Sequence, residues 1–357
     1  MNNDNISATD TAASRTRRMP AEWEPSGAVL IAWPHADTDW AYMLDEVTRC
    51  YCDIARAITD SGSILIVVAP DISIPKKYLA DIDRSRILFC QVATNDTWAR
   101  DFGPITVVDG DNGIRLVDYC FNGWGLKFAA CLDNLITSKL SRAGVFRAPL
   151  DNRLGFVLEG GSVESDGRGT ILTTSECLLS PNRNGDLSRR QIEDYLRDSL
   201  GADRILWVDH GYLAGDDTDS HIDTLARLAP DDTILYVKCD NPADEHYAAL
   251  SQMEQDLMAL RTRDGLPYNL VALPMPDPVY DEDGQRLPAT YANFLITDTS
   301  ILLPVYGQPA NDRLASQIMQ IAFPGRRIIT VDCRPLIRQH GSLHCVTMQL
   351  PKEILPI

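Results

Sequence analysis

Short apolar runs recur along the chain, and polar or turn-forming residues separate them. Such runs predict buried strands, because a strand covered on both faces has no solvent-facing positions that would alternate with the apolar ones. The pattern predicts strands at these places: 28–33, 64–69, 86–92, 205–208, 233–237, 270–273 and 327–331.

Longer segments with helical periodicity alternate with these strands. We predict helices near 41–60, 127–142, 187–200, 243–262 and 311–322. Their recurrence every roughly 60–85 residues, with short strands between them, indicates repeated supersecondary units. No Ser/Gly-rich linker divides the chain, and the Pro/Asp-rich segment 274–288 is typical of a surface loop. The sequence therefore favours one domain, of mixed α/β class, over residues 19–357.

Composition and charge narrow the range of partners. The chain has 357 residues, of which 45% are hydrophobic and 23% charged, as in an ordinary globular protein with a sizeable core. The net charge of −17 argues against nucleic acid and against an anionic membrane surface. It suits a cationic small molecule, although an acidic surface also serves solubility. No apolar stretch is long enough to predict a membrane-spanning helix.

The N-terminal segment and the cysteines indicate in which cellular compartment the protein is expected. Residues 1–18 are polar and lack the apolar core of a signal peptide, so we predict a disordered tail and a cytoplasmic protein. The nine cysteines are odd in number and form no C-x-x-C pair, which favours reduced thiols, most of them in the core. A homodimer is compatible with these features.

The first cluster with chemical potential is Asn-Asp-Thr-Trp-Ala-Arg-Asp-Phe-Gly-Pro at 95–104, directly after a predicted strand. Loops at strand ends often carry catalytic groups. Trp98, Arg100 and Asp101 are its candidates. A plain turn is the alternative, since Asn, Asp, Gly and Pro all form turns.

The second cluster, 216–223, holds four aspartates and His221. At strand spacing His221 and Asp223 would share a face, which would place a proton-transfer group beside a carboxylate. A solvated acidic loop and a metal site are the alternatives. The spacing matches neither an EF-hand loop nor H-E-x-x-H.

The third cluster is His-Gly-Ser-Leu-His-Cys-Val-Thr at 340–347, in which Cys345 lies in a strand-like run after a turn. A lone cysteine is more often a core residue, but a histidine in a distant carboxylate-rich loop is the pattern of a cysteine hydrolase. We expect the adjacent His344 to face the other side of the strand. Glu159, followed by two glycines that permit close backbone approach, adds another carboxylate.

Taken together, these residue types favour attack on a guanidinium carbon. A guanidinium is planar and cationic, and carboxylates bind it in bidentate fashion. Carboxylates beside Cys345 would raise the pKa of its thiol, and a bound cation would offset their field.

Six motifs in one order resemble the agmatine deiminase family, which also contains the bacterial-type peptidylarginine deiminases. They cover nearly the whole chain and stand at 19–25, 95–104, 159–162, 216–223, 291–294 and 344–347. The resemblance implies a pentein-like fold, a five-bladed pseudo-symmetric α/β propeller of ββαβ units.

The resemblance also assigns roles. Cys345 is the nucleophile, His221 the acid/base, and Asp101 and Asp223 hold the guanidinium. The residues implied in substrate binding are Glu159, Trp98, Asn293, Asp217 and Arg100. No metal and no organic cofactor is implied. The substrate is agmatine, which would yield N-carbamoylputrescine and ammonia.

The chain departs from the family pattern at Ser220, Thr224, Asp217 and around Gly341, which leaves the substrate open. Free arginine or peptidylarginine is the first alternative. An amidinotransferase, a catalytically idle ligand-binding propeller and a metallohydrolase are the others.

Overall fold

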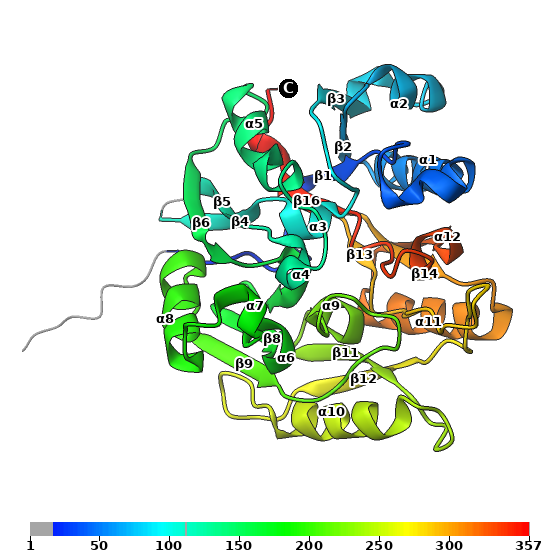
Figure 1. Cartoon of the computed structure of the whole chain (residues 1–357). Coiled ribbons are helices and arrows are strands. Elements are labelled where there is room, and N and C mark those ends of the chain that lie inside the picture. The colour runs from blue at the N-terminus through cyan, green and yellow to red at the C-terminus, as the bar shows by residue number, and fades with distance from the viewer. Residues whose placement is uncertain (1–16, 111–112, 357) are drawn as a thin grey trace, which may run out of the picture.

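The computed structural model describes residues 17–110 and 113–356. Figure 1 shows a mixed α/β architecture in which strands gather in small sheets rather than in one large sheet. The sheets have the orders β16-β1-β2-β3, β4-β5-β6, β7-β8-β9, β10-β11-β12 and β13-β14-β15. The α/β class is therefore confirmed.

Each sheet repeats one pairing scheme. In the four sheets from β4 to β15 the first two strands are antiparallel and the last two are parallel. In the remaining sheet the last strand of the chain, β16, pairs antiparallel with β1, and β1, β2 and β3 run parallel. Both ends of the folded chain thus meet in one sheet.

The strands are β1 (Gly27–Ala32), β2 (Ile64–Ala69), β3 (Ile87–Gln91), β4 (Ile105–Asp109), β5 (Gly113–Cys120), β6 (Leu150–Val157), β7 (Val163–Ser165), β8 (Thr170–Thr174), β9 (Arg204–Val208), β10 (Ala226–Ala229), β11 (Thr233–Lys238), β12 (Asn269–Pro274), β13 (Leu295–Ile296), β14 (Ser300–Val305), β15 (Arg327–Asp332) and β16 (Met348–Pro351). All seven predicted strands are confirmed, as β1, β2, β3, β9, β11, β12 and β15.

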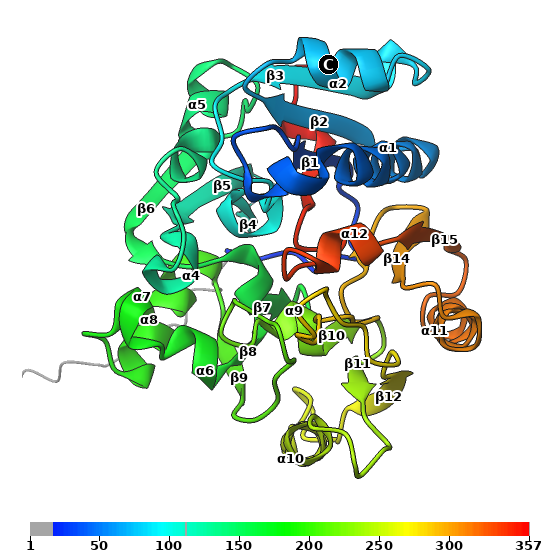
Figure 2. The same cartoon turned by 45° about the vertical axis from the view of Figure 1, so that its right-hand side comes forward.

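The longer helices are α1 (Leu44–Asp60), α5 (Ile136–Arg142), α8 (Arg189–Leu200), α10 (Tyr247–Ala259) and α11 (Pro309–Ala322). The shorter ones are α2 (Ser73–Tyr78), α3 (Ala99–Phe102), α4 (Gly123–Leu126), α6 (Ser175–Leu178), α7 (Pro181–Asn184), α9 (Ile222–Leu225) and α12 (Arg334–Ile337). Figures 1 and 2 place the longer helices at the periphery, whereas α3 and α9 lie near the middle. The middle of the molecule is therefore built from short elements and turns.

Local sequence explains where α8 begins and ends. Ser188 and Gln191 form a capping box, in which each side chain bonds the other residue's backbone N–H. Gly201 follows the last turn with a φ of 69°, a left-handed conformation that glycine adopts without strain.

One predicted helix is wrong in its first half. The segment 127–142 becomes helical only at α5, preceded by a short 3₁₀ turn. The Asn95 side chain accepts the Leu132 backbone N–H at 2.6 Å. A contact with a distant segment thus takes a donor that a continuous helix would use internally.

The predicted tail is partly corrected. Residues 1–16 lie outside the described residues. Arg18, however, exchanges backbone hydrogen bonds of 2.9 and 2.8 Å with Val108, and Arg17 forms an ion pair of 2.6 Å with Asp151. These two arginines are therefore part of the folded structure.

Among the described residues, no helix is long and apolar enough to cross a membrane.

Candidate active site

Four segments that are far apart in sequence meet in the middle of the molecule. They are α3, the Gly160–Ser162 turn before β7, the residues leading into α9, and the turn before β16. Hydrogen bonds join several of these segments directly, as two examples show. The Gly161 N–H donates to the Asp101 carboxylate at 3.0 Å, and the Arg100 N–H donates to the Cys345 carbonyl at 3.1 Å. The motifs singled out in the sequence thus converge on one site.

Cys345 lies in a turn and not in the strand predicted from its apolar neighbours, because β16 begins only at Met348. The Asn293 side-chain oxygen fixes this turn. It accepts the His344 and Cys345 N–H groups at 2.9 and 3.3 Å and lies 3.3 Å from Sγ. Burial raises the pKa of the Cys345 thiol well above its usual value, and Asp223 and Asp101 raise it further. These neighbours therefore favour the thiol over the thiolate at neutral pH.

His221 precedes α9 as its N-cap residue, so the prediction of strand spacing between His221 and Asp223 is wrong. The imidazole is fully buried, and neither ring nitrogen has a hydrogen-bond partner among the described residues. Its Nδ1 lies 3.6 Å from an Asp101 oxygen. Burial lowers the pKa of His221 to about 3, which leaves the ring neutral and able to accept a proton.

The two predicted guanidinium carboxylates have opposite pKa shifts. Burial raises the pKa of Asp101 well above its usual value, and the charge of Asp223 adds to this shift. Burial also acts to raise the pKa of Asp223, but the hydrogen bond from His344 and its charge outweigh it, so the pKa falls below its usual value. Trp124 donates to one Asp101 oxygen at 2.9 Å. The Oδ1 atom of Asp223 has no partner among the described residues.

Gly161 keeps open the space between these three groups. A Cβ at this position would lie 2.6 Å from His221 Nδ1, 2.9 Å from Asp101 Oδ1 and 3.1 Å from Asp223 Oδ2. Any side chain at residue 161 would therefore fill the point where the acid/base candidate and both carboxylates meet.

A pocket with an empty volume of about 420 Å³ opens onto Cys345 and Asp101. Its lining includes three more carboxylates, Asp39, Asp96 and Asp217, and it includes no Lys or Arg of the described chain. Burial and the neighbouring Asp39 raise the pKa of Asp96 to about 7. The pocket is thus acidic.

Aromatic side chains form the apolar part of the pocket. Trp98, Trp124 and Phe128 line it, and Trp98 donates to Asp96 at 3.1 Å. The backbone at Gly341 lies so close to the Trp98 ring that a Cβ there would approach it to 2.1 Å. Trp98 and Asp217, two of the residues implied in substrate binding, thus line the pocket. Asp39 and Trp124 were not singled out from the sequence, because each is isolated in its own segment.

Glu159 and Arg100 take other places than the sequence suggested. Both oxygens of Glu159 accept from Arg183 Nε, at 2.9 and 3.0 Å, and both side chains are fully buried. Arg100 lines a separate cavity together with Glu22 and Met348. The charge of Glu159 is therefore already compensated, and the Arg100 guanidinium does not reach the pocket.

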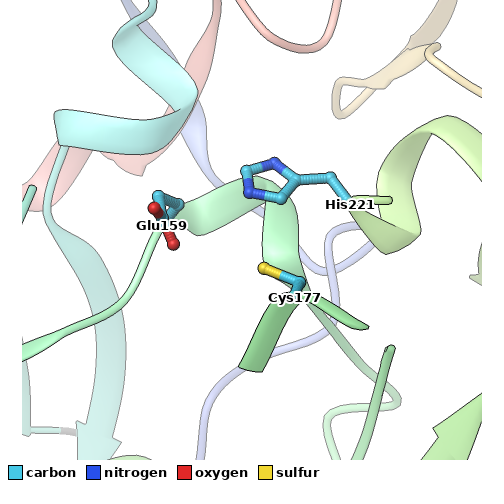
Figure 3. Close-up of side chains that lie close together, drawn as sticks. All are labelled: Glu159, Cys177 and His221. Atoms are coloured by element: carbon cyan, nitrogen blue, oxygen red, sulfur yellow. The ribbon is translucent and has the colours of Figure 1, made fainter. Parts of the chain in front are cut away.

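Among the described residues, two groups of side chains have the spacing of metal ligands. In the first, ligand atoms of Glu159, Cys177 and His221 lie within 4.8 Å of one another, and Figure 3 shows the His221 ring over the gap between the other two. The second consists of Glu22, Glu164 and His344. An arginine already bonds the carboxylates of each group: Arg183 binds Glu159, and Arg227 binds both glutamates of the second. These carboxylates therefore serve as arginine partners in the structure.

A family profile described as Porphyromonas-type peptidyl-arginine deiminase matches residues 18–351 of the chain. The chain belongs to this family. A Legionella pneumophila protein provisionally named agmatine deiminase is 35% identical over 340 residues, which are 94% of this chain and 95% of that protein.

Solved structures agree in fold and differ in name. A Porphyromonas gingivalis protein provisionally named arginine deiminase has a TM-score of 0.89 and 52% identity, covering 95% of this chain and 99% of its own. C. jejuni agmatine deiminase, as a cysteine-to-serine variant with substrate bound, has a TM-score of 0.87 and 36% identity, covering 94% and 96%. These findings confirm the resemblance seen in the six motifs and the prediction of a hydrolase of the deiminase class.

Proposed function

We propose that this family member removes the imino group of agmatine, with Cys345 as the nucleophile. The observation that carries the proposal is the acidic pocket, which presents Cys345 and Asp101 together and has no Lys or Arg in its described lining. Beside Asp101, Asp223 Oδ1 and both ring nitrogens of His221 are buried without a partner among the described residues. Buried polar atoms of this kind are costly unless a ligand satisfies them.

The unpaired atoms suit a guanidinium. Asp101 and Asp223 are acceptors, and a planar cation with several N–H donors binds carboxylates in a fixed orientation. The positive charge also opposes the field of the two aspartates, which raises the pKa of the Cys345 thiol in the empty site. Substrate binding thus favours the thiolate, and in this proposal neutral His221 takes the thiol proton.

The chemistry then has two halves. The Cys345 sulfur forms a bond to the guanidinium carbon, and His221 returns its proton to the departing nitrogen as the C–N bond breaks, releasing ammonia. The covalent intermediate is an amidino-thioether. A water deprotonated by His221 attacks the same carbon, and cleavage of the C–S bond yields the ureido product and regenerates Cys345.

Asp39, Asp96 and Asp217 favour a second positive charge on the substrate. Agmatine carries an ammonium group where arginine also carries a carboxylate. An unpaired carboxylate in this acidic pocket is disfavoured by roughly 1–3 kcal/mol, equivalent to a preference of about tenfold to a hundredfold. Arg100, the residue most able to neutralise such a carboxylate by sequence position, lies in a different cavity.

The test compares kcat/KM for agmatine with kcat/KM for free arginine and for an arginine-containing peptide. Turnover is measured by ammonia release at low salt, where the screening of charges is weakest. We expect agmatine to lead. If kcat/KM for agmatine is equal to or lower than the value for either arginine substrate, agmatine is excluded as the preferred substrate. The deiminase chemistry would remain supported. Turnover of none of the three would contradict the proposal as a whole.

We further propose that the small sheets are the five blades of a pseudo-symmetric propeller. The repeated antiparallel–parallel pairing in each sheet supports this arrangement. The homodimer and the cytoplasmic location stay predictions.

A further inference from the structure

A second cavity has no part in the proposed mechanism. It has an empty volume of about 480 Å³ and shares no lining residue with the pocket that opens onto Cys345. The short helix α3 nevertheless contributes to both, because Asp101 lines the pocket and Arg100 lines the cavity. Thr106 of β4 and Gln349 of β16 also line the cavity.

The described chain has three buried arginines, and they differ in their partners. Arg100, Arg183 and Arg227 are 3%, 8% and 0% exposed. Arg183 forms an ion pair with Glu159 at 2.9 Å, and Arg227 forms one with Glu164 at 2.6 Å. No ion pair among the described residues includes Arg100. A buried charge is costly unless it is paired, so the unpaired guanidinium requires an explanation.

The contacts that the Arg100 side chain does make are weak. Its Nε lies 3.4 Å from the His344 carbonyl oxygen, and its Nη1 lies 3.6 Å from the Met348 sulfur, a poor acceptor. The third nitrogen, Nη2, is buried and has no hydrogen-bond partner among the described residues. Both of its N–H groups are therefore available to a ligand in the cavity.

Two more polar atoms of the same lining are buried without a partner in the described chain. They are Thr106 Oγ1 and Gln349 Oε1. A hydroxyl can donate as well as accept, and a turn of the Gln349 amide would present its NH₂ group in place of the oxygen. Because most buried polar atoms in proteins have partners, three such atoms around one cavity indicate a ligand that accepts hydrogen bonds.

The two carboxylates of the lining are bonded to other groups. Glu24 accepts two hydrogen bonds from Arg18, at 2.6 and 2.8 Å. Glu22 accepts the Ile296 N–H and an N–H of Arg227, both at 2.8 Å. Their negative charges are thus shared with these arginines, and neither carboxylate bonds the unpaired guanidinium.

We propose that the cavity is a binding site for a small anion, which the Arg100 guanidinium holds with Thr106 and Gln349 as further donors. Water would satisfy the hydrogen bonds but would leave the guanidinium without a counter-charge, whereas an anion supplies both. A halide and a small carboxylate such as formate share this chemistry. The site does not rest on the proposed function, because none of these three residues lines the catalytic pocket.

Binding can be measured by the ³⁵Cl NMR line width, which increases when chloride exchanges with a site on a protein. We expect saturable broadening in the unchanged protein. Bromide and formate then compete with chloride. Displacement at a lower formate concentration identifies a carboxylate as the preferred anion, and displacement at a lower bromide concentration identifies a halide. Either order supports an anion site.

Three variants connect the broadening to the cavity. Arg100→Met keeps a long side chain without the charge and should abolish the saturable broadening. Thr106→Val removes one donor and should weaken chloride binding about threefold to tenfold. Thr170→Val is the matched control, since Thr170 Oγ1 is also buried without a described partner but does not line the cavity.

The melting temperature gives a second measurement, because an anion that binds the folded chain stabilises it. Replacing a bulky sulfonate by chloride at constant ionic strength should raise the melting temperature of Thr170→Val and leave that of Arg100→Met unchanged. Absence of saturable broadening, or equal chloride affinity in these two variants, would overturn the proposal in favour of water alone. If Arg100→Met does not fold, equal affinity in Thr106→Val and Thr170→Val would overturn it.

Discussion

The two sides of Asp223 are equally buried and differ in how their polar atoms are bonded. On the pocket side, Asp223 Oδ1 and both ring nitrogens of His221 have no partner among the described residues. On the opposite side, which we call the support side, His344, Arg227 and Glu22 bond one another at 2.7–3.1 Å. Burial alone therefore does not distinguish a catalytic group from a structural one.

The difference has an energetic meaning. An unpaired buried polar atom costs roughly 1–3 kcal/mol, whereas a fully paired network has no such penalty. On the pocket side, a bound ligand would remove this free-energy penalty by pairing the buried atoms. On the support side, the paired network fixes the position of Asp223 without a ligand. Substitutions on the two sides should accordingly affect different quantities.

The largest effect is expected on the pocket side. Cys345→Ser should lower turnover about a thousandfold or more, because a serine hydroxyl is far too weak an acid to replace the thiolate. Its melting temperature and agmatine binding should change little. Ammonia release measures turnover, and calorimetry measures the melting temperature and agmatine binding. Activity within tenfold of the unchanged protein would remove Cys345 as the nucleophile.

On the support side, stability should change first. Arg227→Met leaves Glu164 and Glu22 buried with one partner fewer, and we expect the free energy of unfolding to fall by roughly 3–5 kcal/mol. Urea unfolding measures it. Arg190→Met is the control, since the Arg190 side chain is 90% exposed and its ion pair with Asp194 is long, at 3.9 Å. Equal destabilisation by the two substitutions would contradict the comparison.

An effect of intermediate size is expected for the pH dependence of Cys345 reactivity. Because the pKa of Cys345 lies above its usual value, the thiolate fraction is small at neutral pH and increases with pH. Alkylation of Cys345 by iodoacetamide in the empty enzyme should therefore accelerate about tenfold per pH unit between pH 7 and pH 9. Peptide mass spectrometry follows the site, with exposed Cys131 as an internal reference. A rate that is high and flat across this range would show that Cys345 is already a thiolate.

A chelator is expected to have no effect on turnover, which is the smallest of the predicted changes. Arginines occupy the carboxylates of both groups that have metal-ligand spacing, so dialysis against a strong chelator should leave turnover unchanged. Loss of activity that zinc, calcium or manganese restores would favour a metallohydrolase instead.

The sequence predicted those strands and helices that local patterns of apolar and polar residues indicate. The seven predicted strands lie within one residue of their observed bounds. Nine further strands of the described chain were not predicted. Among them are β7 and β13, whose three and two residues are too few to show a periodicity. Cys345 was placed in a strand because its apolar neighbours resemble one, whereas Asn293 holds it in a turn. The helix predicted over 127–142 was too long for a similar reason, because the Leu132 N–H donates to the distant Asn95 side chain.

The sequence by itself determined which chemical groups the site holds, since a cysteine, a histidine and aspartates in motif order do not depend on the backbone path. Only the tertiary structure decided which charges remain free. Arg183 neutralises Glu159, Arg100 turns to another cavity, and His344 joins Asp223 to Glu22 across separations of 121 and 322 residues. The spacing of residues along the sequence does not predict such pairs. The electrostatics of a buried carboxylate depends on the side chains that folding brings within about 4 Å of it.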